Sequence, residues 1–309
     1  MSSSLISSTL IVKKEHKPKV LVIVGPTASG KTSLSITLAK AYGGEIVSAD
    51  SRQVYRELDL GSGKVTPAEM RNIPHHLLDV ADPRDTYTVT DFVRDARVAI
   101  TDILERGKLP IIVGGSFFYV DALLGRISTP EVEPNFALRE ELEKRSSEEL
   151  FAELEAKDPV RAKDIDRQNP RRLVRALEII AARGSVPPLA PDEPYDALVL
   201  GIEIDKEELH ENIHTRLLKR LDAGMLDEVR IVHTNGLSYE RMEDLGLEYR
   251  YLGRHLQGCM PYDAMVETLE TKIRQFAKRQ MTWLKRDESI HWINPSNTEK
   301  ISSLVQDFL

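Results

Sequence analysis

Residues 19–32, K-V-L-V-I-V-G-P-T-A-S-G-K-T, decide the fold of this chain. Residues 20–24 are apolar, rich in β-branched side chains and too few for an ordinary helix, so they predict a strand that is buried on both faces. Residues 25–32 match the pattern G-x-x-x-x-G-K-[ST], and apolar residues recur behind them at helical spacing. Strand, glycine-rich loop and helix in this order predict a phosphate-binding loop, because backbone N–H groups and a helix N-terminus converge on one anion.

Within this loop, two residues have separate expected roles. We expect Lys31 to reach the phosphate groups as a mobile positive charge, and the hydroxyl group of Thr32 to bind Mg²⁺. The pattern does not identify the phosphate compound. The other members of the expected phosphate site are Gly25, Pro26, Thr27, Ala28, Ser29 and Gly30.

The composition is that of a globular protein. The chain has 309 residues, 41% of them hydrophobic, which is enough for one large core and a second, smaller one. No run approaches about eighteen apolar residues, so the sequence predicts no membrane span. The serine-rich residues 1–17 are expected to form a disordered tail, and the single cysteine, Cys259, is typical of a reducing compartment such as the cytoplasm.

The charges are unevenly distributed along the chain. A formal net charge of −7 argues against a protein that coats nucleic acid over its whole surface, yet it allows a local basic groove. One basic segment contains Arg171, Arg172 and Arg175. A second lies along a predicted helix and contains Lys272, Lys278, Arg279 and Arg286. Two such stripes fit contacts with a phosphate backbone.

Further apolar runs alternate with predicted helices. Strands are expected at residues 45–49, 109–115 and 196–204, with short ones near residues 74–80 and 290–293. Helical spacing predicts one helix that starts at a cap on Thr90 and a long one over residues 262–286. This order indicates an α/β fold, a P-loop NTPase-like parallel sheet core flanked by helices.

Residues 127–194 differ from the rest of the chain. They are charged, punctuated by proline and helical in spacing, and no strand is predicted among them. We therefore expect one catalytic core formed by residues 18–126 and 195–309, and an inserted all-helical domain at residues 127–194.

The chemistry of the site depends on where carboxylates lie. Most loops of this kind serve γ-phosphate hydrolysis or transfer, with an aspartate at the end of a neighbouring strand to hold Mg²⁺. Here one neighbouring strand ends in Gly114-Gly115, and the carboxylate that a strand end delivers is Asp50. One interpretation makes the bound group a leaving group: a diphosphate ester expels diphosphate while Asp50 accepts a proton from the nucleophile. Alternatively, Asp50 caps a helix that starts at Ser51.

Ordered stretches along the chain carry a family resemblance. They are G-P-T-A-S-G-K-T (25–32), S-A-D-S-R-Q-V-Y (48–55), P-H-H-L-L-D (74–79), Y-T-V-T-D-F (87–92), G-K-L-P-I-I-V-G-G (107–115), N-P-R-R-L-V-R-A-L-E (169–178) and A-K-R-Q-M-T-W-L-K-R-D (277–287). The chain resembles the tRNA dimethylallyltransferases, also called isopentenyl-diphosphate:tRNA isopentenyltransferases, over residues 19–294. We expect no C-terminal zinc finger of the kind seen in eukaryotic relatives, so the bacterial type is expected.

The resemblance implies an activity and a set of site residues. A dimethylallyl group would pass from dimethylallyl diphosphate to the exocyclic N6 amine of the adenosine 3′-adjacent to the anticodon of a tRNA. Asp50 is implied as the general base, with Ser116 and Arg216 as catalytic residues that hold the diphosphate. Ser51, Gln53 and Tyr55 are our candidates for holding that adenine base, because their side chains suit a flat polar heterocycle. The other residues expected to contact the anticodon stem-loop are Arg52, Arg171, Arg172, Arg175, Lys278, Arg279 and Gln280. A monomer that uses Mg²⁺ is expected.

Other functions stay open. The family usually has Gly-Gly-Thr-Gly-Leu-Tyr where residues 114–119 are Gly-Gly-Ser-Phe-Phe-Tyr, a difference that concerns the prenyl pocket and allows a degenerate RNA-binding relative. The phosphate loop by itself also allows a small-molecule kinase or an isopentenyltransferase that acts on free adenine nucleotides. The basic segments favour the RNA substrate.

Overall fold

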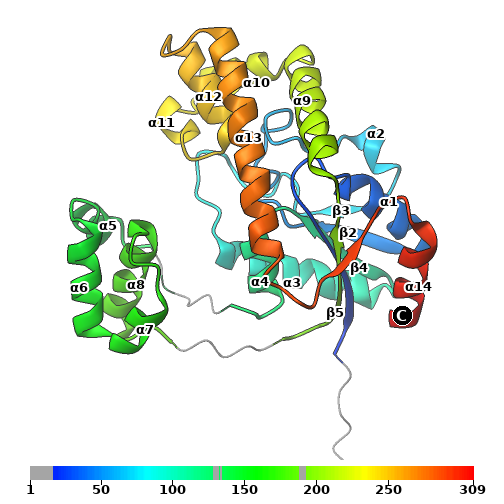
Figure 1. The fold of residues 1–309 in the computed structure, drawn as a ribbon, viewed down its shortest axis with the longest axis horizontal. Helices are drawn as coiled ribbons and strands as arrows, with labels where there is room; N and C mark the ends of the chain where they lie inside the picture. The colour runs from blue at the N-terminus through cyan, green and yellow to red at the C-terminus, as the bar shows by residue number, and fades with distance from the viewer. Residues whose placement is uncertain (1–16, 128–131, 133, 188–192) are drawn as a thin grey trace, which may run out of the picture.

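The computed structural model describes residues 17–127, 132, 134–187 and 193–309. Within these ranges, one six-stranded sheet has the order β3-β2-β4-β1-β5-β6, and all neighbouring strands are parallel (Figure 1). The strands are β1 (Lys19–Val24), β2 (Gly44–Ser48), β3 (His75–His76), β4 (Leu109–Gly114), β5 (Asp196–Ile202) and β6 (His291–Ile293). The expected α/β fold is confirmed. Apart from Lys17, the expected tail lies outside the described residues.

The position of β1 in the sheet explains its composition. It lies between β4 and β5, and residues 20–24 are all buried. A strand covered on both faces needs apolar side chains at successive positions, which is why this run does not alternate with polar residues. Its carboxyl end places the phosphate loop at the middle of one sheet edge.

The expected strand at residues 74–80 is shorter than the sequence suggests. Leu77 and Asp79 have φ values of 64° and 58°, outside the extended region, and pairing with β2 is confined to His75 and His76. The Nε2 atom of His76 lies 2.8 Å from a carboxylate oxygen of Glu45. His76 therefore fastens this edge strand to β2.

Helices cover both faces of the sheet. Helices α1 (Lys31–Tyr42) and α14 (Thr298–Phe308) pack on one face, and α3 (Val89–Glu105) and α4 (Phe117–Leu123) pack on the other. A short helix, α2 (Pro67–Met70), lies in the connection between β2 and β3. Within the described ranges, every helix is too short or too polar to traverse a membrane.

Helix α3 begins earlier than expected. The Oγ1 atom of Thr88 accepts a hydrogen bond from the N–H of Asp91 (3.2 Å), and the Asp91 carboxylate accepts one from the N–H of Thr88 (2.9 Å). The prediction of a cap at Thr90 was wrong, because this reciprocal box needs an acidic or amide side chain three residues after the cap, and Thr90 is followed there by Val93.

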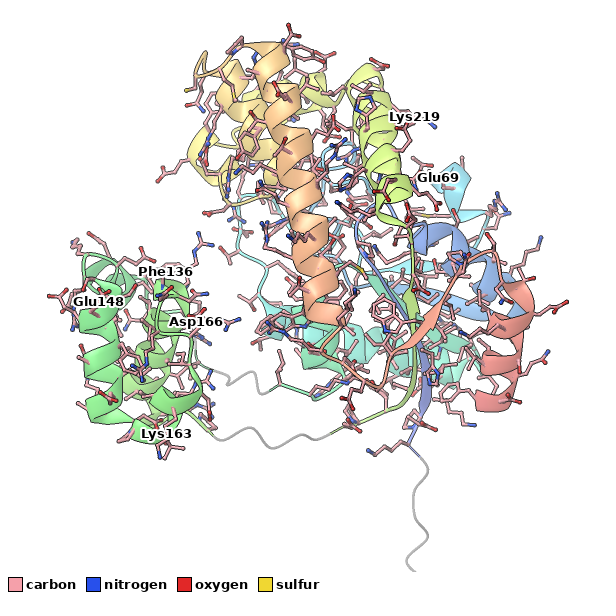
Figure 2. The ribbon with its side chains drawn as sticks, in the orientation of Figure 1. Glu69, Phe136, Glu148, Lys163, Asp166 and Lys219 are labelled. Carbon is pink, nitrogen blue, oxygen red and sulfur yellow. The ribbon has the colours of Figure 1, made fainter. Side chains whose placement is uncertain are left out.

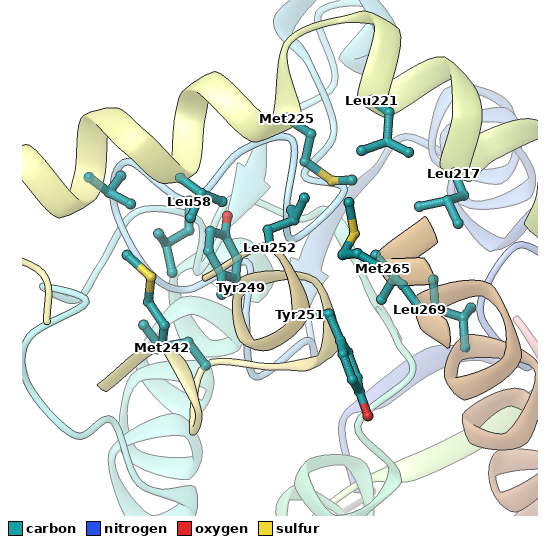
Figure 3. Close-up of a cluster of buried hydrophobic side chains, with 14 of the residues drawn as sticks. Leu58, Leu217, Leu221, Met225, Met242, Tyr249, Tyr251, Leu252, Met265 and Leu269 are labelled. Atoms are coloured by element: carbon teal, nitrogen blue, oxygen red, sulfur yellow. The ribbon is translucent and has the colours of Figure 1, made fainter. Parts of the chain in front are cut away.

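The helices after β5 form a second compact layer. They are α9 (Lys206–Asp222), α10 (Met225–Thr234), α11 (Tyr239–Met242), α12 (Leu247–Leu256) and α13 (Tyr262–Leu284). Leu58, from the loop after β2, inserts into their shared core beside Tyr249 (Figure 3). The Tyr249 hydroxyl donates to Glu228 (2.7 Å), and the same carboxylate accepts from the N–H of Leu60 (2.6 Å). These contacts anchor the loop that follows Asp50.

The inserted helices have a core of their own. They are α5 (Phe136–Leu142), α6 (Ser147–Lys157), α7 (Pro159–Asp164) and α8 (Pro170–Arg183), drawn in green in Figure 1. Their buried cluster includes Leu150, Leu154 and Leu173, and all of its members among the described residues come from this segment. An inserted helical body is therefore present, and the bounds 127–194 stay a prediction.

A buried carboxylate organises this insertion. Glu178 is 1% exposed and accepts hydrogen bonds from Arg139 Nε (2.8 Å), from Arg175 and from the N–H of Asn135 (2.6 Å). Burial opposes the negative charge of Glu178, but the hydrogen bonds from the two arginines outweigh it and hold the pKa of Glu178 below its usual value. The carboxylate therefore ties α8 to α5 and to the chain before it.

We expect Glu178→Ala to unfold the insertion selectively. Removal of this buried carboxylate breaks its hydrogen bonds with Arg139, with Arg175 and with the N–H of Asn135, and breaking such a buried pair costs about 3–5 kcal/mol. Urea unfolding combined with limited proteolysis should show cleavage within residues 134–187 at urea concentrations where the core stays intact. Glu148→Ala, at an exposed position of α6 labelled in Figure 2, is the control and should unfold like the wild type. Equal resistance of both variants would contradict the prediction.

Candidate active site

The phosphate loop joins the carboxyl end of β1 to the N-terminus of α1. Ala28 and Gly30 have φ values of 62° and 88°, so the backbone turns sharply just before the helix. Among the described residues, no hydrogen bond uses the N–H groups of Ala28, Ser29 or Gly30. The loop therefore offers backbone donors to an anion beside the positive end of a helix dipole.

Lys31 lies against its own loop. Its Nζ atom donates hydrogen bonds to the carbonyl oxygens of Gly25 (2.9 Å) and Pro26 (2.7 Å). Burial and then the positive charge of Arg216 lower the pKa of Lys31 to about 8, while the carboxylate of Asp50 acts in the opposite direction. An anionic ligand bound here would offset the repulsion between the charges of Lys31 and Arg216.

Asp50 follows directly after β2. Its Oδ1 atom accepts hydrogen bonds from the N–H groups of Arg52 (2.8 Å) and Gln53 (3.4 Å), and residues 51–54 form a turn rather than a helix. The helix-cap alternative is therefore excluded. Its Oδ2 atom accepts no hydrogen bond from any residue in the described ranges, so this oxygen is available to accept a proton from a ligand.

Ser116 lies beside Asp50 because β2 and β4 are neighbours in the sheet. Its Oγ atom accepts a hydrogen bond from the N–H of Ser51 (2.9 Å) and donates one to the Ser51 hydroxyl (3.2 Å). Gly114 permits this approach, since a Cβ atom there would lie only 2.0 Å from the carbonyl oxygen of Ala49. The glycine that stands in place of an acid thus brings two strand ends together.

Arg216 reaches the site from α9. One of its guanidinium nitrogens donates to the carbonyl oxygen of Gly63 (3.1 Å), in the connection after β2. Burial is the main cause that lowers the pKa of Arg216, and the charge of Arg220 adds to it, whereas Glu248 and Asp50 act in the opposite direction. The guanidinium group of Arg216 therefore interacts electrostatically with both Lys31 and Asp50.

A cavity of about 50 Å³ lies between the phosphate loop and the end of β2. One part of its wall is polar, with Lys31, Thr32, Asp50 and Gln53. Another part is apolar, with Ile46, Val65 and Val113. The sequence did not identify this apolar wall, because two of its residues belong to buried strands and the third lies in a polar loop. An apolar residue in a buried strand looks the same in the sequence whether it only fills the core or also lines a cavity.

His75 is a further residue of this cavity. Its Nδ1 atom lies 2.9 Å from the carbonyl oxygen of Ile73, so this nitrogen carries the proton. Its Nε2 atom is buried and has no hydrogen-bond partner among the described residues. Burial lowers the pKa of His75. The wall of the cavity therefore contains an unpaired acceptor nitrogen on a neutral ring.

Two residues expected to contact tRNA are buried instead. Tyr55 is 3% exposed, packs in the core of the C-terminal helices and accepts a hydrogen bond from the N–H of Tyr87 (3.2 Å) on its hydroxyl oxygen. Gln280 is 5% exposed, and its amide is bonded to the backbone of the phosphate loop. Both side chains are hydrogen-bonded inside the protein, and the expectation of a direct tRNA contact stays a prediction for these two residues.

The other expected tRNA contacts differ in accessibility. Arg171, Arg172, Lys278 and Arg279 are exposed. The guanidinium group of Arg175 is bound to Glu178, so its position is explained by the fold of the insertion. The turn residues Ser51, Arg52 and Gln53 are half-buried around Asp50.

The unusual pair Phe117-Phe118 lies away from this cavity. Phe117 lines a separate, mainly apolar cavity of about 240 Å³ together with Val24 and Val120. Phe118 is 50% exposed. Among the described residues, neither phenylalanine lines the cavity of Asp50, so this departure from the family pattern lies outside that lining.

Comparisons with known proteins agree with this geometry. The family model described as IPP transferase matches residues 53–287. The chain is 39% identical to the tRNA dimethylallyltransferase of Shouchella clausii, over 94% of this chain and 96% of the relative, and 43% identical to tRNA dimethylallyltransferase 1 of Geotalea daltonii, over 89% and 90%.

Solved structures give the same result. The crystal structure of a full-length tRNA isopentenylpyrophosphate transferase from Bacillus halodurans superposes with a TM-score of 0.71 at 33% identity and covers 94% of this chain and 98% of that one. A eukaryotic dimethylallyltransferase acting on tRNA superposes with a TM-score of 0.79 at 26% identity, over 94% and 77%. From its parallel sheet, its phosphate loop and these matches, we conclude that the chain belongs to the IPP transferase family.

Proposed function

We propose that this chain transfers the dimethylallyl group of dimethylallyl diphosphate to the exocyclic N6 amine of the adenosine 3′-adjacent to the anticodon in tRNA, and releases diphosphate. The observation that carries the proposal is a single cavity lined by a carboxylate with a free oxygen, Asp50, and by the cation of a phosphate loop, Lys31. The names of the relatives support the substrate and the group transferred. We further propose that the enzyme acts as a monomer in the cytoplasm.

In this mechanism, Asp50 is the general base. An adenine amine is a weak nucleophile, so the proton leaves as the bond between N6 and the allylic carbon forms, and a fixed carboxylate accepts it. The carbon–oxygen bond to the diphosphate breaks with its electron pair on the leaving oxygen. Lys31, Arg216 and the loop N–H groups stabilise that negative charge. The apolar wall with Val65 is placed to accept the five-carbon chain.

Mg²⁺ fits the donors at this site. Thr32 is exposed at the start of α1, and among the described residues no cluster of His, Cys, Asp and Glu forms a metal site. Mg²⁺ commonly takes few protein ligands and completes its octahedron with substrate phosphate oxygens and water. The Thr32 hydroxyl would hold the ion, which when bound would neutralise part of the diphosphate charge.

The tRNA has to present its adenine to a cavity inside the protein. A base within a folded loop reaches such a cavity when it is flipped out, which costs about a few kcal/mol. We propose that Arg171 and Arg172 on the insertion and Lys278 and Arg279 on α13 supply the phosphate contacts that offset this cost. All four side chains are exposed.

The proposed function is tested by incubation of the protein with radiolabelled dimethylallyl diphosphate, Mg²⁺ and unmodified tRNA. Label should enter tRNA and be found on the adenosine next to the anticodon. Label in free AMP instead would favour the nucleotide-prenylating alternative. Consumption of ATP with a small-molecule acceptor would favour a kinase, and binding of tRNA without any turnover would favour a degenerate RNA-binding relative.

We expect removal of the basic pair on α13 to weaken tRNA binding mainly through electrostatics. A side chain that neutralises one phosphate contributes about 1 to the slope of log affinity against log salt, so Lys278→Ala combined with Arg279→Ala should reduce this slope by about 2. Filter binding of tRNA between about 50 and 200 mM salt measures the slope. Lys40→Ala, an exposed lysine on α1, is the control. An unchanged slope in the double variant would exclude these two residues from the interface.

A further inference from the structure

We propose that Gln280 is a positioning residue for the phosphate loop, so that helix α13 controls the binding of the diphosphate substrate as well as facing the tRNA. This inference rests on the proposed function. It links Gln280 to the diphosphate substrate, although its basic neighbours in the sequence suggest tRNA. Lys278 and Arg279 are exposed on α13, whereas Gln280 is turned into the protein and is 5% exposed.

The amide of Gln280 bridges two parts of the active site. Its Oε1 atom accepts a hydrogen bond from the N–H of Thr27 in the phosphate loop (2.8 Å). Its Nε2 atom donates a hydrogen bond to the carbonyl oxygen of Gly115 at the end of β4 (2.9 Å). Both ends of a buried amide are satisfied, so its orientation is fixed, and removing it leaves a loop N–H without a partner.

This bridge decides which loop donors face the ligand. The N–H of Thr27 is bonded to Gln280, whereas the N–H groups of Ala28, Ser29 and Gly30 are not used by any described residue. An anion-binding loop works when its free donors converge on one point. By holding the first part of the loop, Gln280 aligns the donors that follow it.

The backbone around Gly115 is shaped to admit this amide. A Cβ atom at position 115 would lie 2.7 Å from Nε2 of Gln280 and 4.0 Å from Nζ of Lys31. The amide therefore reaches the same wall as the loop cation. The second glycine of the Gly114-Gly115 pair is explained by this contact.

Helix α13 is rigidly held at this point. One turn beyond Gln280, Nε1 of Trp283 donates a hydrogen bond to the carboxylate of Asp121 on α4 (3.0 Å). The exposed basic residues and the buried amide thus belong to one anchored stretch of helix. A contact that fixes the helix against tRNA acts on the same element that holds the diphosphate loop.

The test separates the two substrates. For wild type, Gln280→Ala and Lys278→Ala, calorimetry with inorganic diphosphate and Mg²⁺ gives the affinity of the loop, and steady-state kinetics give KM for dimethylallyl diphosphate and for tRNA. We expect Gln280→Ala to weaken diphosphate binding and raise the donor KM by about 10-fold, with the tRNA KM changed less than about 2-fold. Lys278→Ala should show the reverse pattern.

Two further variants keep the test decisive. Gln280→Glu retains the acceptor for Thr27 but loses the donor to Gly115 and adds a negative charge near the ligand, so it should bind diphosphate more weakly than Gln280→Ala. Gly115→Ala disturbs the same bridge from the other side and replaces Gln280→Ala if that variant does not fold. Melting temperatures of all variants are compared with wild type.

The outcomes are distinguishable. Unchanged diphosphate affinity with a raised tRNA KM would make Gln280 an RNA contact and overturn the inference. A parallel weakening for both substrates with a lowered melting temperature would show a role in folding alone and also overturn it. If Gln280→Ala weakens diphosphate binding but wild type transfers no label to tRNA, the proposed function fails and the positioning role stands.

Discussion

Replacement of Asp50 by asparagine should reduce the rate of prenyl transfer by about 10³-fold while both substrates still bind. Asparagine has the same shape, and its side-chain oxygen can still accept the hydrogen bonds that Oδ1 receives from Arg52 and Gln53, so the turn after β2 is kept. The variant lacks the second carboxylate oxygen as a proton acceptor. The expected effect is therefore on kcat, with the KM values for dimethylallyl diphosphate and tRNA close to those of wild type.

The measurement is single-turnover transfer of radiolabel into tRNA at saturating enzyme. Asp222→Asn, at an exposed position at the end of α9, is the matched control because it removes the same charge away from the cavity. A rate for Asp50→Asn above about one tenth of wild type would remove Asp50 from the role of general base. A large rise in KM with unchanged kcat would assign Asp50 to binding instead.

Replacement of Lys31 by methionine should weaken the binding of diphosphate by about 100-fold or more. The lysine supplies a desolvated positive charge beside the free N–H groups of the loop, and methionine fills a similar volume without charge. Calorimetry with inorganic diphosphate and Mg²⁺ measures the decrease directly. Binding of tRNA should be retained, since Lys31 lies in the cavity rather than on the exposed basic stripe.

The same residue predicts a pH dependence. The pKa of Lys31 is lowered to about 8, so the unliganded enzyme loses this charge as the pH rises through about 8. Diphosphate binding then has to restore the proton, and the affinity should fall by about tenfold for each further pH unit. Lys31→Arg keeps its charge over this range and should show no such fall beyond that due to the ligand itself. Identical pH profiles for wild type and Lys31→Arg would contradict the prediction.

The stability of the unliganded protein should change with pH in the opposite direction to its diphosphate affinity. The pKa of Lys31 in the folded protein lies below its value of 10.5 in the unfolded chain, so the unfolded chain binds more protons between about pH 8 and 10.5. The free energy of unfolding of the unliganded protein should therefore rise with pH across this window. Below about pH 8 the full cost of the buried charge is present, and Lys31→Met should melt at a higher temperature than wild type.

Local sequence patterns were sufficient to predict the elements that form the expected phosphate site. The apolar run before Gly25 predicted β1, the glycine and lysine spacing predicted the loop, and the position of Asp50 at a strand end predicted its place beside the loop. These features are encoded by residues close together in sequence, because strand burial, turn conformation and helix periodicity depend on near neighbours. The change in composition at residues 127–194 likewise predicted an inserted helical body.

Local sequence patterns did not predict the role of a residue where that role depends on the residues it contacts. A cap at Thr90 is compatible with helical spacing, but Thr88 has in Asp91 the reciprocal partner that Thr90 lacks. Tyr55 and Gln280 lie in motifs suggestive of an RNA surface, yet both point into the protein. The family resemblance implied a role for Arg216, and the packing of α9 over the connection after β2 is what brings its side chain to the site.

The amino-acid sequence by itself determined the parallel sheet, the phosphate loop, the candidate base Asp50 and the family to which the chain belongs. Only the tertiary structure decided which atoms meet: Gln280 with Thr27, Arg216 with Gly63, and Glu178 with two arginines. The physical reason is that backbone preference is local, whereas a buried polar group takes its partner from whatever element packs against it, however far away in the chain.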